Sequence, residues 1–427
     1  MRQALASPEH MNPGSQESEA ERYLLGLFDF EKERDARALA KPYTLERVEC
    51  ALDVLGRPER RFRVAHIAGT KGKGSTAEHL YRLVAQLAGG PVGLFTSPHL
   101  VSLRERIRLG EELIPPGDLL EFSRRVLELN RERFAGGLTF FETVLIVALL
   151  HFKARGAQLV ILETGLGGRL DATNAVEKNL AVLTRIGLDH QELLGNTLEL
   201  IAGEKAGILK RGVPALALKQ LGAVNEVFLR RAREVGCALD FVEPPPAPQE
   251  VAPSAWENAH LALAAAARLF PDRIGAWPGA AAVAARTVRG RMDARRWRGQ
   301  DFYLDAAHNG LSMEMLAGEL RKYPGHYLLC FAMAAGRDPR DLLAPLLPVV
   351  GEAVFAELPG GRPGVSPHLI LKVAKGLKPD IRARVLDESL ESWMEKPVSG
   401  AVKLITGSFY IVGAALSLIE ARPQSSG

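Results

Sequence analysis

A strand, a glycine-rich turn and a helix follow one another at residues 64–87, and this succession constrains the fold more than any other part of the chain. The apolar run Val64–Ala68 leads into the turn Gly69–Thr76, after which apolar residues recur at helical spacing as far as Leu87. The free backbone N–H groups at the start of such a helix, together with the helix dipole, attract anions. The pattern therefore predicts a phosphate-binding turn between a strand and a helix.

The turn contains the residue types that hold phosphate. Its glycines let the backbone approach phosphate oxygens closely: Gly69, Gly72 and Gly74. Lys73 can neutralise the outer phosphates, and Ser75 or Thr76 can offer a hydroxyl to a phosphate or its magnesium. Only Thr70 and Lys71 separate the first glycine from the Gly-Lys pair, whereas the common P-loop has four residues there, so this is a variant loop. The alternative is an ordinary glycine-rich turn without a ligand.

Length and composition indicate the class of protein. A chain of 427 residues exceeds what one core usually organises, which predicts two domains, and 47% apolar with 24% charged residues is typical of globular proteins. The three cysteines have neither a disulfide pattern nor metal-ligand spacing, which favours a reducing cytoplasm. No apolar run reaches membrane-spanning length. A net charge of +4 without a basic, aromatic-rich run suits anionic small substrates and leaves nucleic-acid binding the weaker alternative.

The order of apolar runs and helical stretches predicts an α/β protein of two domains. Short apolar runs predict the strands: 63–68, 93–95, 159–162, 180–183 and 215–218, then 302–305, 327–331, 352–355 and 402–405. We expect a disordered tail over 1–18, a P-loop-type ATPase domain with a parallel-rich sheet over 19–284, an arginine-rich linker over 285–299, and a smaller Rossmann-like domain over 300–427. Helices are predicted near 19–30 and 256–270. The proline-rich stretch 242–253 is predicted to be a surface excursion of the first domain.

Several polar residues follow predicted strands. Glu163 ends a buried-type strand, a position from which nucleotide enzymes hold magnesium, and the loop Thr164–Asn174 follows it. His190 follows the next strand and would lie near Glu163 if the two strands are neighbours; a purely structural histidine is the alternative. Lys205 shares the apolar face of a helix predicted over 198–209, which points to a buried functional lysine. Alternatively, its stem lies along that face and its ammonium reaches solvent.

The second domain repeats the arrangement. Asp305 ends a strand and His308 lies in the following turn, while Gly407 and Ser408 precede a helix and offer a cap or an anion site. Each of these could be only a cap. Together they predict that this domain supplies the far wall of an interdomain cleft.

The ordered motifs resemble those of bacterial folylpolyglutamate synthases and dihydrofolate synthases, within the Mur ligase superfamily. The resemblance extends from about residue 20 to residue 420. The motifs that carry it are Gly69–Ser75, Thr96–Leu100, Glu105–Ile107, Phe140–Glu142, Glu163–Asn174, Gly187–His190, Glu204–Gly207, Asp305–Asn309 and Gly407–Ser408.

The resemblance implies an ATP-dependent ligase that transfers the γ-phosphoryl group of ATP to the carboxylate of dihydropteroate or a reduced folate, after which the amino group of L-glutamate displaces phosphate. It implies catalytic roles for Lys73, Lys205 and His190. It places the nucleotide on Gly69, Thr70, Gly72, Lys73, Gly74, Ser75, Asn258, Arg291 and Asp305. It implies magnesium, in two ions, held in part by Ser97, Glu163 and His190.

For the substrates, the resemblance implies two groups of residues. The pterin would lie near Thr139, Phe140, Phe141, Glu142, Leu170, Asp171 and Ala172, and the glutamate near Arg106, His308 and Ser408. It also implies that Lys205 carries a carbamate, which would turn a buried cation into an anion able to steady a second magnesium. A monomer without nucleic-acid or membrane partners is expected.

The chain departs from the family pattern at a few positions. Lys71 stands where asparagine is usual in the phosphate loop, Gln191 where threonine is usual, Ala306 where glycine is common, and Gly310 where proline often follows Asn309. Lys71 adds charge beside the nucleotide and bears on the details of ATP binding. Two alternative functions remain: another Mur-type ligase acting on a cell-wall precursor or amino-acid polymer, and a nucleotide-binding regulatory protein without ligase activity.

Overall fold

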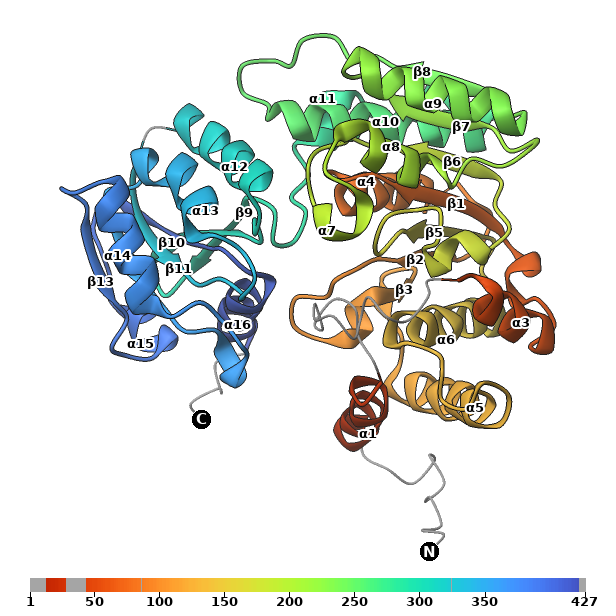
Figure 1. Ribbon diagram of the computed structural model, residues 1–427, viewed down its shortest axis with the longest axis horizontal. Helices are drawn as coiled ribbons and strands as arrows, with labels where there is room; N and C mark the ends of the chain where they lie inside the picture. Colours follow the sequence, from red (N-terminus) through yellow and green to blue (C-terminus); the bar gives the residue numbers. More distant parts are fainter. Residues whose placement is uncertain (1–12, 28–43, 86, 324, 422–427) are drawn as a thin grey trace, which may run out of the picture. The chain divides into compact units, whose positions relative to one another are not determined.

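The computed structural model describes residues 13–27, 44–85, 87–323 and 325–421 (Figure 1). The chain forms two compact units. The N-terminal unit consists of Met1–His99, Leu103–Ala247 and Ala255–Val283, and the C-terminal unit consists of Leu100–Ser102, Pro248–Ser254 and Ala284–Gly427. Among the residues described, no helix combines the length and the apolar character needed to cross a bilayer.

The N-terminal unit is built on an eight-stranded sheet in the order β4-β3-β2-β5-β1-β6-β7-β8. Its strands are β1 (Arg63–Ala68), β2 (Val92–Phe95), β3 (Ile107–Leu109), β4 (Glu112–Leu113), β5 (Leu159–Glu163), β6 (Leu180–Leu183), β7 (Ala215–Leu218) and β8 (Leu239–Val242). The pairs from β2 to β8 are parallel, and β3 and β4 add antiparallel strands at one edge. The central strands β1, β5 and β6 are almost wholly buried, which explains why they read as continuous apolar runs.

Helices cover this sheet. They are α1 (Pro13–Leu25), α3 (Glu46–Val54), α4 (Lys73–Val84), α5 (Pro116–Phe134), α6 (Phe140–Ala154), α7 (Gln191–Leu194), α8 (Leu198–Ala206), α9 (Gly222–Val235), α10 (Pro253–Leu269) and α11 (Ala280–Ala284). One core joins α1, α3, α5 and α6 to the strands β1, β2 and β5, and α5 and α6 lie side by side in Figure 1. A second core joins α8 and α9 to β6 and β7. The helix α4 packs on β1, β2 and β5.

The C-terminal unit has a six-stranded sheet in the order β13-β12-β11-β14-β10-β9. Its strands are β9 (Asp293–Trp297), β10 (Gln300–Asp305), β11 (His326–Phe331), β12 (Glu352–Phe355), β13 (Arg382–Val385) and β14 (Ala401–Thr406). Two cores pack on the sheet: one with α12 (Gly310–Lys322), α13 (Pro339–Leu346) and α14 (Pro367–Leu377), the other with α15 (Leu390–Glu395) and α16 (Phe409–Glu420). All pairs are parallel except β9 with β10. The Rossmann-like α/β class predicted for this half is confirmed.

Several sequence predictions about boundaries differ from the structure, among them the helix predicted over 198–209, which ends at Ala206. Residues 293–297 of the expected linker form β9, because a tight turn with positive φ at Arg298 and Gly299 folds them back on β10. Residues 248–254 of the proline-rich stretch belong to the C-terminal unit, where Lys322 and Tyr323 donate hydrogen bonds to the carbonyls of Val251 and Glu250.

The expected tail also differs in part. Residues 1–12 lie outside the described residues, but residues 13–18 form the first turns of α1, which begins at Pro13. The fixed φ of proline is compatible with the first position of a helix. The predicted helix over 19–30 thus begins and ends earlier, and residues 28–30 lie outside the described part of the chain.

Candidate functional site

The phosphate loop (residues 69–75) joins the end of β1 to α4. The amides of Thr70 and Lys71 both donate to the carbonyl of Arg185, which fixes the loop to the chain that follows β6. Gly72 caps α4 with a φ of 84°, and Gly69 has a φ of 155°. A Cβ at Gly69 would lie 1.8 Å from the Thr184 hydroxyl, so only glycine fits there. The loop therefore presents the start of a helix at the carboxyl end of a central strand, as the sequence predicts.

Asn258 comes from α10, far along the chain, and lies against this loop. Its side-chain oxygen would be 2.1 Å from a Cβ at Gly72, and it accepts a hydrogen bond of 3.3 Å from the Thr76 hydroxyl. The structure thus brings together the loop and a residue whose predicted contact with nucleotide came from the family resemblance alone.

Two of the predicted metal ligands meet beside the loop. The Ser97 amide donates to Oε2 of Glu163 at 3.1 Å, and the Glu163 carboxylate oxygens lie 3.4 and 3.5 Å from the position of a Cβ on Gly74. Glu163 is only 4% exposed. A carboxylate therefore lies at the start of α4, where the terminal phosphates of a nucleotide would be held.

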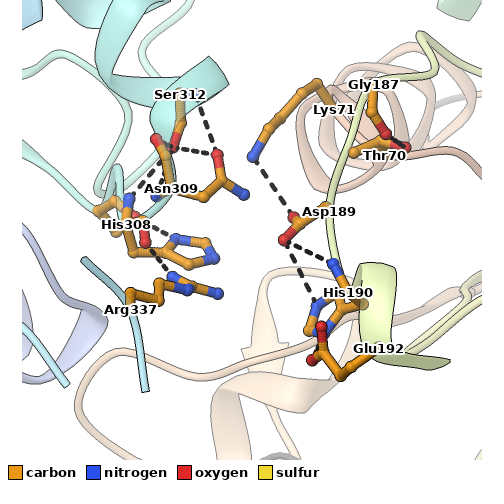
Figure 2. A network of polar contacts seen from close by, with 11 residues as sticks. Thr70, Lys71, Gly187, Asp189, His190, Glu192, His308, Asn309, Ser312 and Arg337 are labelled. Atoms are coloured by element: carbon orange, nitrogen blue, oxygen red, sulfur yellow. Dashed lines mark hydrogen bonds and ion pairs between the residues drawn. The ribbon is translucent and has the colours of Figure 1, made fainter. Parts of the chain in front are cut away.

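The third predicted ligand, His190, follows β6, and Asp189 precedes it. Figure 2 shows the Asp189 carboxylate between Lys71 and His190: Lys71 Nζ is 3.7 Å and His190 Nε2 is 3.9 Å from its oxygens. The premise that the strands of Glu163 and His190 are neighbours is wrong, because β1 lies between β5 and β6. Asp189 was not among the predicted site residues, although its place after a strand was a signal. It gives the unusual Lys71 a counter-ion.

Lys205 lies on α8 and is only 4% exposed, so the alternative in which its ammonium reaches solvent is wrong. Burial, and next the charge of Lys73, lower its pKa from 10.5 to about 7, against the opposing carboxylates of Asp189 and Asp171. A large fraction of this side chain is therefore a neutral, nucleophilic amine near neutral pH.

The predicted pterin residues of α6 divide into two kinds. Thr139 and Glu142 form a capping box: the Glu142 amide donates to the Thr139 hydroxyl, and the Thr139 amide donates to the Glu142 carboxylate. Their Thr-x-x-Glu spacing was the missed signal for this structural role. Phe140 is buried beneath the guanidinium of Arg106, 5.1 Å from the ring centre, whereas Phe141 is half-buried.

The loop that follows β5, here called the substrate loop (residues 164–174), lies beside Phe141. A Cβ at Gly165 would be 2.7 Å from the Phe141 ring. Asp171 is buried and holds the loop together: it accepts from the Leu166 amide at 2.8 Å and from the Thr173 amide at 3.0 Å. Its neighbours Leu170 and Ala172 are half-buried and buried.

In the C-terminal unit, the predicted residues gather around a phenylalanine that sequence reasoning missed. The Phe409 ring centre is 5.0 Å from that of His308 and 5.1 Å from the Arg291 guanidinium carbon. Asp305 accepts from the Met292 and Ala307 amides, each at 2.8 Å. Ser408 caps α16 by accepting from the Tyr410 amide.

The same corner contains a second capping residue and an arginine. Asn309 caps α12 in a capping box with Ser312, and Arg337 donates to the His308 carbonyl (Figure 2). A cavity of about 630 Å³ in this unit lies at the ends of β12 and β13, and no predicted residue lines it. It is therefore not part of the predicted site.

Among the described residues, no group of three His, Cys, Asp or Glu side chains is arranged to hold a metal. A magnesium ion that accompanies a nucleotide takes only one or two protein carboxylates, since phosphate oxygens and water complete its shell. The carboxylate of Glu163 and the hydroxyl-bearing Ser97, placed at the phosphate loop, fit that donor set.

Comparisons with known proteins agree with this geometry. No protein-family model matches the chain. It is 32% identical over 406 residues to the dihydrofolate synthase/folylpolyglutamate synthase of Escherichia coli, covering 88% of this chain and 92% of that one. The folylpolyglutamate synthase of Mycobacterium tuberculosis, solved with ADP and AMPPCP, superposes with a TM-score of 0.82 at 26% identity, over 97% of this chain and 100% of that one. The bifunctional Yersinia pestis enzyme, solved with AMPPNP and Mn, gives 0.75 at 27% identity, over 97% and 99%.

Fold, site and relatives define the class: the protein is an ATP-dependent ligase with a phosphate-loop unit and a Rossmann-like unit. Within that class, the chain belongs to the dihydrofolate synthase/folylpolyglutamate synthase family.

Proposed function

We propose that this protein uses ATP to join L-glutamate to the carboxylate of dihydropteroate and of reduced folates. The observation that carries the proposal is the position of Glu163, a buried carboxylate directly against Gly74 of the phosphate loop. A loop that only bound phosphate would be weakened by this negative charge, whereas a loop that holds a nucleotide with its metal requires it. Family membership supplies the substrates.

The reaction needs two positioned steps. The substrate carboxylate attacks the γ-phosphorus of ATP, the bond to the bridging oxygen breaks, and ADP leaves. The glutamate amine then attacks the acyl carbon, phosphate leaves, and the amine loses its proton. In the first step a carboxylate approaches a polyanion, so the loop amides and Lys73 act by neutralising charge and by holding the groups in line. Asn258 supports the loop from α10.

The residues proposed to hold magnesium are Glu163, Ser97 and His190. Magnesium bound there would neutralise charge on the transferred phosphoryl group. The carboxylate and hydroxyl suit a hard cation, and an imidazole is a less usual ligand for magnesium than for manganese or zinc. The Asp189 carboxylate accepts a hydrogen bond from the His190 backbone amide at 3.2 Å and lies 3.9 Å from Nε2 of its ring, so we propose that it orients this histidine.

We propose that Lys205 carries a carbamate. Its neutral amine would attack carbon dioxide, forming an N–C bond and releasing one proton. The product is an anion near Lys73 and Lys71, the two cations whose charges now disfavour a protonated Lys205. An ammonium at this buried position is costly, whereas the carbamate anion would be stabilised by the opposite charges of Lys73 and Lys71. The anion could also steady a second magnesium.

The remaining roles are proposals from the family resemblance. Arg291 and Asp305 would contact the nucleotide, and Arg106, His308 and Ser408 the glutamate. The pterin would lie beside the surface that Phe141 and the substrate loop form together, since these are in contact and Phe141 is half-exposed. Thr139 and Glu142 would also lie near the pterin, at the end of α6 that they cap. We also propose a monomeric, cytoplasmic enzyme, for which light scattering measures the oligomeric state and cell fractionation the compartment.

The direct test is ADP formation by the purified chain with dihydropteroate, tetrahydrofolate or uridine-linked muramyl peptide as acceptor. We expect ADP only when a pterin acid and glutamate are both present, and none from Lys73→Ala, while Lys219→Ala keeps full activity because Lys219 is an exposed residue paired with Glu243. Activity with the muramyl peptide would indicate another Mur-type ligase. ATP binding without glutamate-dependent turnover would indicate a regulatory protein.

A further inference from the structure

Lys178 precedes β6 and is 8% exposed, yet none of the steps above uses it. We propose that Lys178 is a positioning residue that fixes the substrate loop against α8, and with it the surroundings of the pterin acid and of Lys205. This inference rests on the proposed function for the identity of the loop's ligand, but the contacts that carry it are independent of that identity.

One branch of contacts runs from Lys178 through His66 and Thr173 to Asp171 and Leu166 of the substrate loop. Lys178 Nζ is 2.8 Å from Nδ1 of His66, and Nε2 of His66 is 2.7 Å from the Thr173 hydroxyl. The Thr173 hydroxyl donates to Oδ1 of Asp171 at 2.5 Å, and the other oxygen of Asp171 accepts from the Leu166 amide. Because the amine donates to Nδ1, the proton of the neutral imidazole lies on Nε2, so every bond in the branch has one donor and one acceptor.

The second branch runs from Lys178 through Asn174 to Arg169 of the loop and to the end of α8. Lys178 Nζ donates to Oδ1 of Asn174 at 2.7 Å. The amide nitrogen of Asn174 donates to the carbonyl of Arg169, in the loop, at 2.9 Å and to that of Gly207, just after Lys205, at 3.2 Å. One side chain therefore joins the loop to the end of the helix that carries Lys205.

The chemistry of Lys178 fits this role. Among the described residues no carboxylate contacts it, and burial, followed by the charge of Lys210, lowers its pKa well below the ordinary value. Burial likewise lowers the pKa of His66, which keeps the imidazole neutral. Lys178 donates to two acceptors, Asn174 and His66, so the amine is hydrogen-bonded on both branches. A buried lysine with no carboxylate of the described chain in contact, only the more distant charge of Asp171, is costly, which is the mark of a group retained for what it holds in place.

The test compares Lys178→Met, which keeps the side-chain length and removes the donors, with Lys403→Met, a buried lysine of the C-terminal unit outside this network. Amide hydrogen exchange is measured on both full-length variants together with KM for ATP and for the pterin acid. In Lys178→Met we expect the Leu166 and Thr173 amides to exchange about tenfold faster and KM for the pterin acid to rise roughly tenfold, since a small misplacement of a binding loop has effects of this size. KM for ATP stays within about twofold.

Lys403→Met is expected to lower the unfolding midpoint without changing the loop amides or either KM. Thr173→Val removes only the first branch and is expected to give the same changes as Lys178→Met, but smaller ones. If Lys178→Met does not fold, Thr173→Val takes its place in the test. Wild-type exchange in the loop, or equally faster exchange throughout the N-terminal unit, would overturn the proposal. If wild-type protein forms no ADP with a pterin acid, the proposed function fails, while the exchange data still decide the role of Lys178.

Discussion

At the scale of a residue, the proton on Lys205 determines whether this side chain can react with carbon dioxide. Its pKa of about 7 means that most of it is ammonium at pH 6 and most is free amine at pH 8. Because only the free amine forms a carbamate, we expect bicarbonate-dependent activity to rise about tenfold from pH 6 to pH 8. ADP formation in carbonate-free and bicarbonate-supplemented buffers measures the effect.

The control for this prediction is Lys205→Arg, which stays charged and forms no carbamate, and whose residual activity should not respond to bicarbonate. A carbon-13 carbamate signal from labelled bicarbonate should be seen in the wild-type protein and be absent in this variant. Wild-type activity that is the same with and without bicarbonate at both pH values would rule out the carbamate.

Gly72 gives a second residue-scale prediction. A Cβ at this position would lie 2.1 Å from the Asn258 oxygen in addition to requiring a φ of 84°. Gly72→Ala should therefore displace Asn258 or the loop, and we expect ATP affinity to fall at least about tenfold, measured by calorimetry. Gly89→Ala is the matched control, because Gly89 has a similar φ of 72° but open space around it. It should lose about 1 kcal/mol of unfolding free energy and no ATP affinity. Equal losses of affinity in both variants would contradict the prediction.

At the scale of an element, the short helix α15 is held by one buried lysine. Lys403 of β14 donates to the carbonyls of Trp393, Met394 and Lys396 at 2.5, 2.9 and 2.6 Å. These groups are the otherwise unpaired carbonyls at the end of α15. Lys403→Met should lower the free energy of unfolding by about 3 kcal/mol, because it leaves buried carbonyls without donors.

Urea unfolding checks this value. Lys396→Met removes an exposed lysine that pairs with Glu388 at the same helix end, and it should change the free energy by less than about 1 kcal/mol. If the two variants lose the same amount, the contacts of Lys403 do not stabilise α15 as described.

Elements differ in how much of them the sequence predicts. The bounds of β1, β6 and β7 agree with the apolar runs, because strands buried on both faces consist of continuous apolar residues. The strand β9 was mistaken for a linker because only alternate residues of Asp-Ala-Arg-Arg-Trp are buried or half-buried, and charged side chains are common on edge strands. The edge strands β8 and β13 have the same mixed burial and were also missed.

The candidate site shows the same division. The end of a central strand and the glycine turn placed Glu163 at the phosphate loop, since both positions follow from the local chain. The same reasoning put His190 near Glu163 on the premise that their strands are neighbours, and that premise is wrong. Asn258, Phe409 and Lys178 reach their sites from distant elements, and no local pattern specifies which residue of a helix or loop will face another element. The sequence also could not predict whether the Lys205 ammonium is buried, because helical spacing identifies the face of a helix but not whether the end of a long side chain reaches water.

At the scale of the whole molecule, the chain enters the C-terminal unit before residue 284. Leu100–Ser102 belongs to that unit, although the residues on either side belong to the N-terminal unit. The segment is held at Gly413 of α16, where a Cβ would lie 1.9 Å from the Leu100 carbonyl oxygen. Ser97 precedes the segment and Arg106 follows it, so its position bears on two residues of the proposed site.

Gly413→Ala tests this connection. The added methyl cannot fit beside the Leu100 carbonyl, so the segment must move away from α16. We expect faster proteolytic cleavage at Val101, which is already 42% exposed, and a KM for glutamate raised roughly tenfold through the displacement of Arg106. Gly376→Ala is the matched control, since Gly376 lies in helix α14 with open space around it, and alanine there should slightly stabilise the protein. Cleavage and KM values equal to those of the control would mean that the hold of α16 on this segment does not position the site.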